Sequence, residues 1–210
     1  MKRTLINWLG LLGVLSFASY AAAVLFSPLA YPGYDWMSQA VSDLSAANAP
    51  SKVLWSQLSS LYGICGIICL VLVCVFVQEK LNRILRVGIY TFTIMNGVSF
   101  VGYTLFPLSA SGYAGTIQDI MHVYLVTVLV VLLSVVSLVM IMIGGFRGRR
   151  YRSLATWASI ALGMMFVGAI GTGLAPSAYF GIFERFSTFS ASGFTMVLGV
   201  YLFNSFQLEK

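Results

Sequence analysis

Charged side chains are scarce in this sequence. Only 9% of its 210 residues are Asp, Glu, Lys or Arg, whereas 59% are hydrophobic. A water-soluble domain of this length needs far more charge to cover its surface, so the composition excludes a soluble protein and indicates one whose solvent is lipid.

Cysteine and histidine are also rare, which limits the chemistry that the chain can support. The three cysteines lie in one apolar stretch without a CxxC pair, and they are expected to pack between helices. The only histidine is His122, and one histidine with scattered acids argues against a catalytic zinc site. No metal or other cofactor is therefore expected.

Six apolar runs are long enough to cross a bilayer, whose core of about 30 Å requires about 20 helical residues. The first run also resembles a secretory signal, but it stays apolar to Phe26, beyond a signal core of about 7 to 15 residues. We predict an all-α membrane protein, with residues 1–210 forming one domain of six transmembrane helices. These helices are expected at residues 5–26, 54–77, 86–106, 119–143, 154–174 and 183–206.

The basic residues indicate the orientation, because short loops rich in Lys and Arg stay in the cytoplasm. Ten of the twelve basic residues fall on one side of the predicted helices, and only Lys52 and Arg185 fall on the other. We expect both termini in the cytoplasm and the chain in the cytoplasmic membrane. A basic run beside a membrane is more typical of contact with anionic lipid than with nucleic acid, so no nucleic-acid partner is expected.

The longest outer segment, residues 27–53, contains a short periodic stretch. Apolar residues recur at spacings of three and four over residues 35–47, which predicts an amphipathic helix lying in the interface and covering the outer end of the bundle.

Polar residues concentrate toward the same outer end, where a ligand or catalytic site is expected. Asp119 and His122 lie three residues apart at the start of the fourth predicted helix, so the carboxylate is able to orient the imidazole. We predict a pocket lined by this set, in which Asp43, His122 and Glu184 are the candidate catalytic residues. The candidate ligand-binding residues are Ser42, Asp119, Arg185, Trp36 and Tyr34.

A purely structural role is the alternative for each of these side chains. Thr116 and Asp119 have the spacing of a capping box, and Asp119 and Glu184 both favour the positive end of a helix dipole. A serine, His122 and an acid would supply the groups of a nucleophilic triad, but the sequence contains no Gly-x-Ser-x-Gly elbow.

The order of several short motifs resembles a known family. Tyr31-Pro32-Gly33-Tyr34 and Ser42-Asp43-Leu44 are followed by Phe106-Pro107, by His122, and by the segment from Gly181 to Phe186. This arrangement is similar to the six-helix bacterial and archaeal family known as domain of unknown function 998. The resemblance covers nearly the whole chain, and it implies that Asp43, His122, Glu184 and Arg185 form a shared polar site without naming a reaction.

Three functions remain open from the sequence. The first is binding or handling of a membrane lipid or other amphiphile, because an outward pocket in a bilayer admits lipid and Arg185 suits a phosphate or carboxylate head group. The second is a membrane-embedded hydrolase acting on a lipid-like substrate, and the third is a structural scaffold without a ligand. Whether the protein is an enzyme, and its oligomeric state, are not determined by these patterns.

Overall fold

The protein is all-helical over residues 3–207, the part that the computed structural model describes, and no strand occurs in that range. Within these described residues the bundle contains nine α-helices interspersed with short 3-10 and π segments. The α-helices are α1 (Leu5–Leu9), α2 (Leu11–Phe26), α3 (Lys52–Leu58), α4 (Tyr62–Val77), α5 (Arg83–Leu105), α6 (Ile117–Ile120), α7 (Val128–Phe146), α8 (Arg152–Leu174) and α9 (Phe180–Phe203). The short segments are η1 (Ser27–Ala30), η2 (Ser42–Ser45), η3 (Met121–Thr127), η4 (Arg149–Tyr151) and η5 (Ser177–Tyr179).

These helices form six segments with the length and apolar composition needed to cross a membrane. The spans are Leu5–Ala30, Lys52–Val77, Arg83–Leu105, Ile117–Phe146, Arg152–Leu174 and Ser177–Phe203. The chain is therefore a multi-pass membrane protein, and the prediction of six long apolar helices is confirmed.

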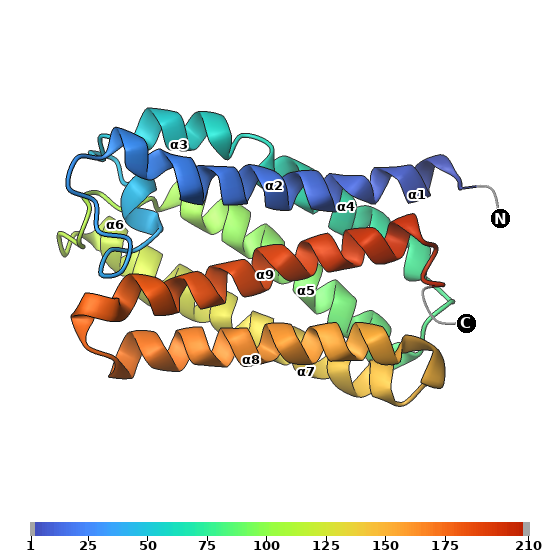
Figure 1. The fold of residues 1–210 in the computed structure, drawn as a ribbon. Helices are drawn as coiled ribbons and strands as arrows, with labels where there is room; N and C mark the ends of the chain where they lie inside the picture. The colour runs from blue at the N-terminus through green and yellow to red at the C-terminus, as the bar shows by residue number, and fades with distance from the viewer. Residues whose placement is uncertain (1–2, 208–210) are drawn as a thin grey trace.

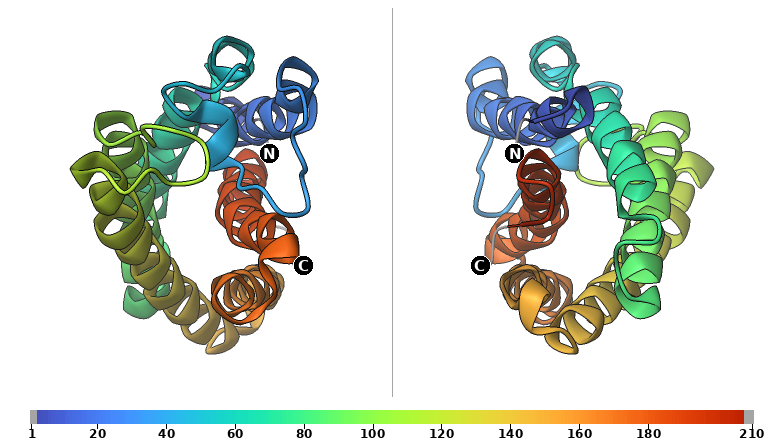
Figure 2. Two further views of the ribbon diagram at one scale, coloured as in Figure 1. Left: turned by 90° about the vertical axis from the view of Figure 1, so that its left-hand side faces the viewer. Right: turned by 90° about the vertical axis from the view of Figure 1, so that its right-hand side faces the viewer.

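The long helices close into a ring. Each packs on its neighbour along the chain, from α2 through α4, α5, α7 and α8 to α9, and α9 packs back on α2. The end-on views show this arrangement directly (Figure 2). The core lies between the helices, where for example the rings of Phe92 on α5 and Phe194 on α9 meet edge to face at 5.1 Å.

Glycine allows the closest helix approaches. A Cβ on Gly10 would lie 2.5 Å from the carbonyl oxygen of Gly199, so only glycine permits the start of α2 to cross α9 at this distance. A Cβ on Gly144 would lie 2.5 Å from the amide nitrogen of Leu85, which fixes the contact between α7 and α5 in the same way.

The two ends of the bundle differ in character. One end, here called the loop end, carries the two long connections, at 27–51 and 106–116, together with the shorter connection at 175–179. The opposite end, here called the basic end, carries the short connections at 78–82 and 147–151 together with both ends of the described chain (Figure 1).

Several helix boundaries differ from those expected from hydropathy. The fifth predicted helix, 154–174, nearly coincides with α8 (Arg152–Leu174). The second predicted helix is interrupted at residues 59–61, between α3 and α4. The third begins earlier, at Arg83, because the side chain of Asn82 accepts a hydrogen bond from the amide of Leu85. The sixth ends at Phe203, because Ser205 and Phe206 adopt left-handed φ values of 56° and 55°.

The amphipathic helix predicted at residues 35–47 does not form. That segment is a series of turns followed by one turn of 3-10 helix, η2. Its backbone bonds to side chains instead: the amide of Ala40 donates to Asp43, and the amide of Val41 donates to Glu184 of α9. The helical spacing of its apolar residues was therefore misleading, because charged side chains replaced the intrahelical partners.

Candidate functional site

Asp43 ties two loops together at the loop end. Its side chain is 5% exposed, and its carboxylate accepts the amide of Ala40 at 3.0 Å and the amide of Gly112 at 2.9 Å. The hydroxyl of Ser111 donates to the backbone carbonyl of Asp43 at 3.1 Å. Asp43 thus fixes the first connection against the second, and the left-handed φ of +82° at Gly112 suits glycine at this turn.

Arg185, one turn inside α9, holds the first connection from the other side. Its Nη1 donates to the carbonyls of Trp36, Gln39 and Gly181 at 2.7, 3.2 and 2.7 Å. Its Nη2 donates to the hydroxyl of Tyr34 at 2.7 Å. All four acceptors are neutral, and among residues 3–207 no carboxylate is hydrogen-bonded to the half-buried guanidinium.

Glu184 precedes Arg185 on α9 and binds the backbone of the same connection. Its Oε2 accepts the amide of Val41 at 2.6 Å. Its predicted role as an acid that starts a helix is wrong, because α9 begins at Phe180 and has no acid in its first turn. Glu184 and Arg185 instead bind the backbone of residues 36–41. The carboxylate of Glu184 accepts the amide of Val41, and the guanidinium of Arg185 donates to the carbonyls of Trp36 and Gln39.

Tyr34 and Trp36 surround the guanidinium. Both rings have their centres 6.0 Å from the Cζ of Arg185, and Trp36 remains 54% exposed. The hydroxyl of Tyr34 donates to the carbonyl of Ala40 at 2.8 Å. Burial raises the pKa of Tyr34 to about 12, against the opposing effect of Arg185, so its hydroxyl keeps its proton at neutral pH.

Asp119 forms a second network with the 106–116 connection. Its carboxylate accepts the amide and the hydroxyl of Ser109 at 2.7 to 2.9 Å, and the amide of Thr116 at 3.2 Å. Thr116 in turn accepts the amide of Asp119, which completes the capping box that the spacing predicts. Asp119 is fully buried, and these bonds are accounted for by a structural role in starting the fourth span.

His122 lies on η3, a π-helical segment that links α6 to α7. Its Nδ1 lies 2.7 Å from the carbonyl oxygen of Phe106, the residue that ends α5. Since a carbonyl only accepts, Nδ1 donates this bond, so in a neutral ring Nε2 is the nitrogen without a proton. Nε2 has no hydrogen-bond partner among the described residues, and π-helical turns recur at functional sites in other proteins.

The structure brings the predicted residues to one end without joining them into a triad. Among residues 3–207 no hydrogen bond links Asp43, His122 and Glu184 to one another, because each is bonded to loop backbone instead. Ser109 donates to Asp119 and not to His122. Ser42 lies between Val41 and Asp43, and its carbonyl accepts the hydroxyl of Ser45.

Most of the chain matches one known protein family. Residues 14–201 match the family described as a protein of unknown function, DUF998. The chain belongs to the DUF998 family. No curated protein and no solved structure gives a match. The DUF998 match covers both networks at the loop end, so the resemblance seen in the sequence is confirmed, and it adds no reaction or ligand.

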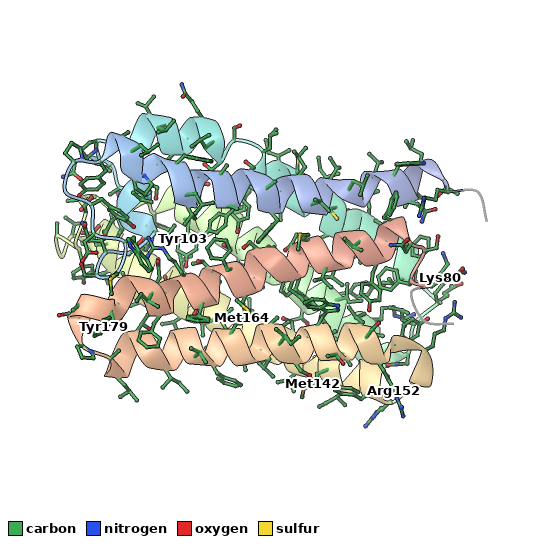
Figure 3. The ribbon with its side chains drawn as sticks, viewed as in Figure 1. Lys80, Tyr103, Met142, Arg152, Met164 and Tyr179 are labelled. Atoms are coloured by element: carbon green, nitrogen blue, oxygen red, sulfur yellow. The ribbon has the colours of Figure 1, made fainter. Side chains whose placement is uncertain are left out.

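One neighbour of the site in this DUF998 protein escaped the sequence analysis. The ring of Tyr103 on α5 lies 4.7 Å from that of His122, and its hydroxyl lies 3.0 Å from the hydroxyl of Thr127. Tyr103 lies toward the loop end of the bundle (Figure 3). The available signal was weak, since a tyrosine three residues before Phe106 also fits the aromatic belt of a membrane interface.

No metal site accompanies these groups in the described part of this DUF998 chain. Over residues 3–207 no three side chains of His, Cys, Asp or Glu are grouped to hold a metal ion. The three cysteines are free thiols within α4, and two of them are buried.

Proposed function

We propose that this protein binds a membrane amphiphile with an anionic head group at its loop end. The observation that carries the proposal is the guanidinium of Arg185, whose four hydrogen-bond acceptors are all neutral. A cation in this position attracts a phosphate or carboxylate more strongly than one already paired with an acid, and its Nε donates to no acceptor among the described residues.

The surroundings of Arg185 suit a ligand that is part polar and part apolar. Trp36 is 54% exposed beside the guanidinium, and indole rings favour the interface between head groups and acyl chains. Ser42 and Tyr34 belong to the first connection, and Asp119 on α6 is bonded to the second. In our proposal these three residues shape the head-group site. Asp43 and Glu184 hold the two connections in place through the amides of Gly112 and Val41.

The proposal includes an orientation. The basic end carries Lys80, Arg83, Arg86 and the 147–152 segment, whereas the loop end carries Lys52 and Arg185. Because basic loops are retained in the cytoplasm, we infer that both termini are cytoplasmic, that the loop end faces outward, and that the membrane is the cell membrane.

Native mass spectrometry of the gently purified protein tests the ligand. Trp36→Ala removes the exposed ring but none of the hydrogen bonds to Arg185, since its contribution is a backbone carbonyl. Leu29→Ala is the matched control, because Leu29 is 82% exposed at the same end. Copurifying lipid is expected on wild type and on the control, and less on Trp36→Ala and Arg185→Ala. Equal lipid on all four proteins would remove the support for this function.

A membrane-embedded hydrolase is the second candidate, favoured by the geometry of His122. The carbonyl of Phe106 fixes the tautomer and leaves Nε2 as a base beside Tyr103. His122→Asn keeps a donor for Phe106 but removes the ring base, whereas His122→Ala removes both. Hydrolysis of a lipid ester is expected in wild type and in neither variant. Turnover that survives His122→Asn would exclude this chemistry.

A further inference from the structure

The basic end contains a pocket that the loop-end site does not explain. It has a volume of about 410 Å³ and lies where the start of α1, the end of α4, the α7–α8 connection and the end of α9 meet. Such a volume falls within the range of small-ligand sites. The side chains that define its chemistry are Asn7, Phe76, Lys80, Arg150, Tyr151 and Ser205.

The two cations of this pocket are paired with aromatic faces. The Nζ of Lys80 lies 3.5 Å from the centre of the Phe76 ring, and the Cζ of Arg150 lies 5.8 Å from that of Tyr151. Both cationic side chains are exposed, and Lys80 projects at the basic end of the bundle (Figure 3). An aromatic face orients a cation but does not neutralise it, so the pocket keeps a positive potential.

A hydroxyl adds a neutral donor to the pocket wall. The side-chain Nδ2 of Asn7 donates to the backbone carbonyl of Leu202 at 2.8 Å and to the hydroxyl oxygen of Ser205 at 3.0 Å. Ser205 therefore accepts in this bond, and its own hydrogen remains to be donated. Ser205 and Phe206 both adopt left-handed backbone conformations, which non-glycine residues rarely do, and this turn carries Ser205 to the pocket.

We propose that the pocket binds the phosphate of an anionic membrane lipid in the leaflet at the basic end. Two cations that have no hydrogen-bonded carboxylate among residues 3–207, together with a hydroxyl donor, match a phosphate group. The position at the helix ends places that phosphate at the depth of lipid head groups, with Phe76 beside the apolar part of the lipid. This site is at the opposite end from Arg185, and it stands whether or not the loop end binds an amphiphile.

Residue-specific lysine acetylation tests the proposal on the full chain. The protein is placed in nanodiscs of phosphatidylcholine alone or with added phosphatidylglycerol, and the acetylation rates of Lys80 and Lys52 are read from their peptides. Lys52 is an exposed lysine at the loop end and serves as an internal control for exclusion of the reagent. Inorganic phosphate added to phosphatidylcholine nanodiscs distinguishes a free anion from a lipid head group.

Phosphatidylglycerol is expected to slow acetylation of Lys80 severalfold and to leave Lys52 unchanged. In Arg150→Gln, the phosphatidylglycerol concentration needed for half of this protection is expected to rise more than about tenfold, since a hydrogen bond to a charged group is lost. Arg83→Gln removes an exposed arginine at the same end outside the pocket, and it should protect like wild type. Equal melting temperatures of the two variants show that both are folded.

Four results would overturn the site. They are equal acetylation of Lys80 in both lipids, equal slowing of Lys80 and Lys52, full protection in Arg150→Gln, and equal protection by inorganic phosphate alone. The last would reveal a site for a free anion, and the second would reveal a general effect of membrane charge. None of these outcomes depends on Trp36 or Arg185, so failure here is separable from failure at the loop end.

Discussion

Replacing Asp43 by Ala is expected to release the first and second connections from each other. The substitution removes the acceptor for the amides of Ala40 and Gly112 beside a side chain that is only 5% exposed. A hydrogen bond to a charged group contributes about 1.5–3 kcal/mol, so two amount to at least about 3 kcal/mol. At about 1.4 kcal/mol per factor of ten, the loops should open on the order of 100-fold more often.

Hydrogen exchange of the protein in a mild detergent measures this opening. Peptides covering residues 36–44 and 108–114 should exchange faster in Asp43→Ala by about that factor, while peptides from α5 and α7 keep their protection. Asp35→Ala is the matched control. It removes an acid from the same connection, but Asp35 is exposed, and among residues 3–207 its carboxylate accepts hydrogen bonds only from the neighbouring Met37 and Ser38.

Two outcomes would refute the role assigned to Asp43. If Asp43→Ala and Asp35→Ala exchange alike, the carboxylate does not hold the loops. If residues 36–44 open but 108–114 do not, the bond from Gly112 contributes nothing, and the second connection is held by other contacts such as that between the amide of Ala47 and the carbonyl of Leu108.

Two further predictions concern packing and pH. Gly144→Ala should destabilise the protein by about 1–3 kcal/mol in denaturant titrations, because the added Cβ would meet the backbone of Leu85. The control Gly97→Ala should be neutral or stabilising, because a Cβ there would have no atom within 4 Å. Equal effects of the two substitutions would contradict the close contact at Gly144. The pKa of Tyr34 is raised from 10.0 to about 12, so its contribution to stability is complete below pH 10 and is lost as pH rises toward 12. The free energy of unfolding should therefore fall less steeply over that interval in Tyr34→Phe than in wild type, and parallel curves would show that Tyr34 does not titrate in this way.

The spans were predictable because bilayer thickness acts on whole segments. Any run of about 20 apolar residues satisfies that requirement, so the six helices follow from hydropathy alone. Their ends depend on single side chains. The box of Thr116 and Asp119 was visible in the spacing, whereas the cap at Asn82 and the break at residues 59–61 were not seen in it.

The sequence predicted which residues lie at the loop end, but not the hydrogen bonds that they form. Position along the chain and the period of the helices placed Asp43, Asp119, His122, Glu184 and Arg185 at one end. Their partners are mostly backbone groups of the connections, such as the carbonyl of Phe106 for His122 and the amide of Val41 for Glu184. Backbone groups carry no residue-specific signal in a sequence, so a ligand site and a loop clamp built from the same side chains look identical there.

Both binding proposals require that the loop end and the basic end lie on opposite faces of one membrane. Thiol labelling in intact cells measures this most directly, with Ala114→Cys at the loop end and Arg147→Cys at the basic end, both exposed positions. A membrane-impermeant maleimide is expected to label Ala114→Cys in intact cells, and to label Arg147→Cys only after the membrane is permeabilised. Labelling of both positions from the same side would contradict the placement on which the two sites depend, and labelling of Arg147→Cys from outside would contradict the proposed orientation.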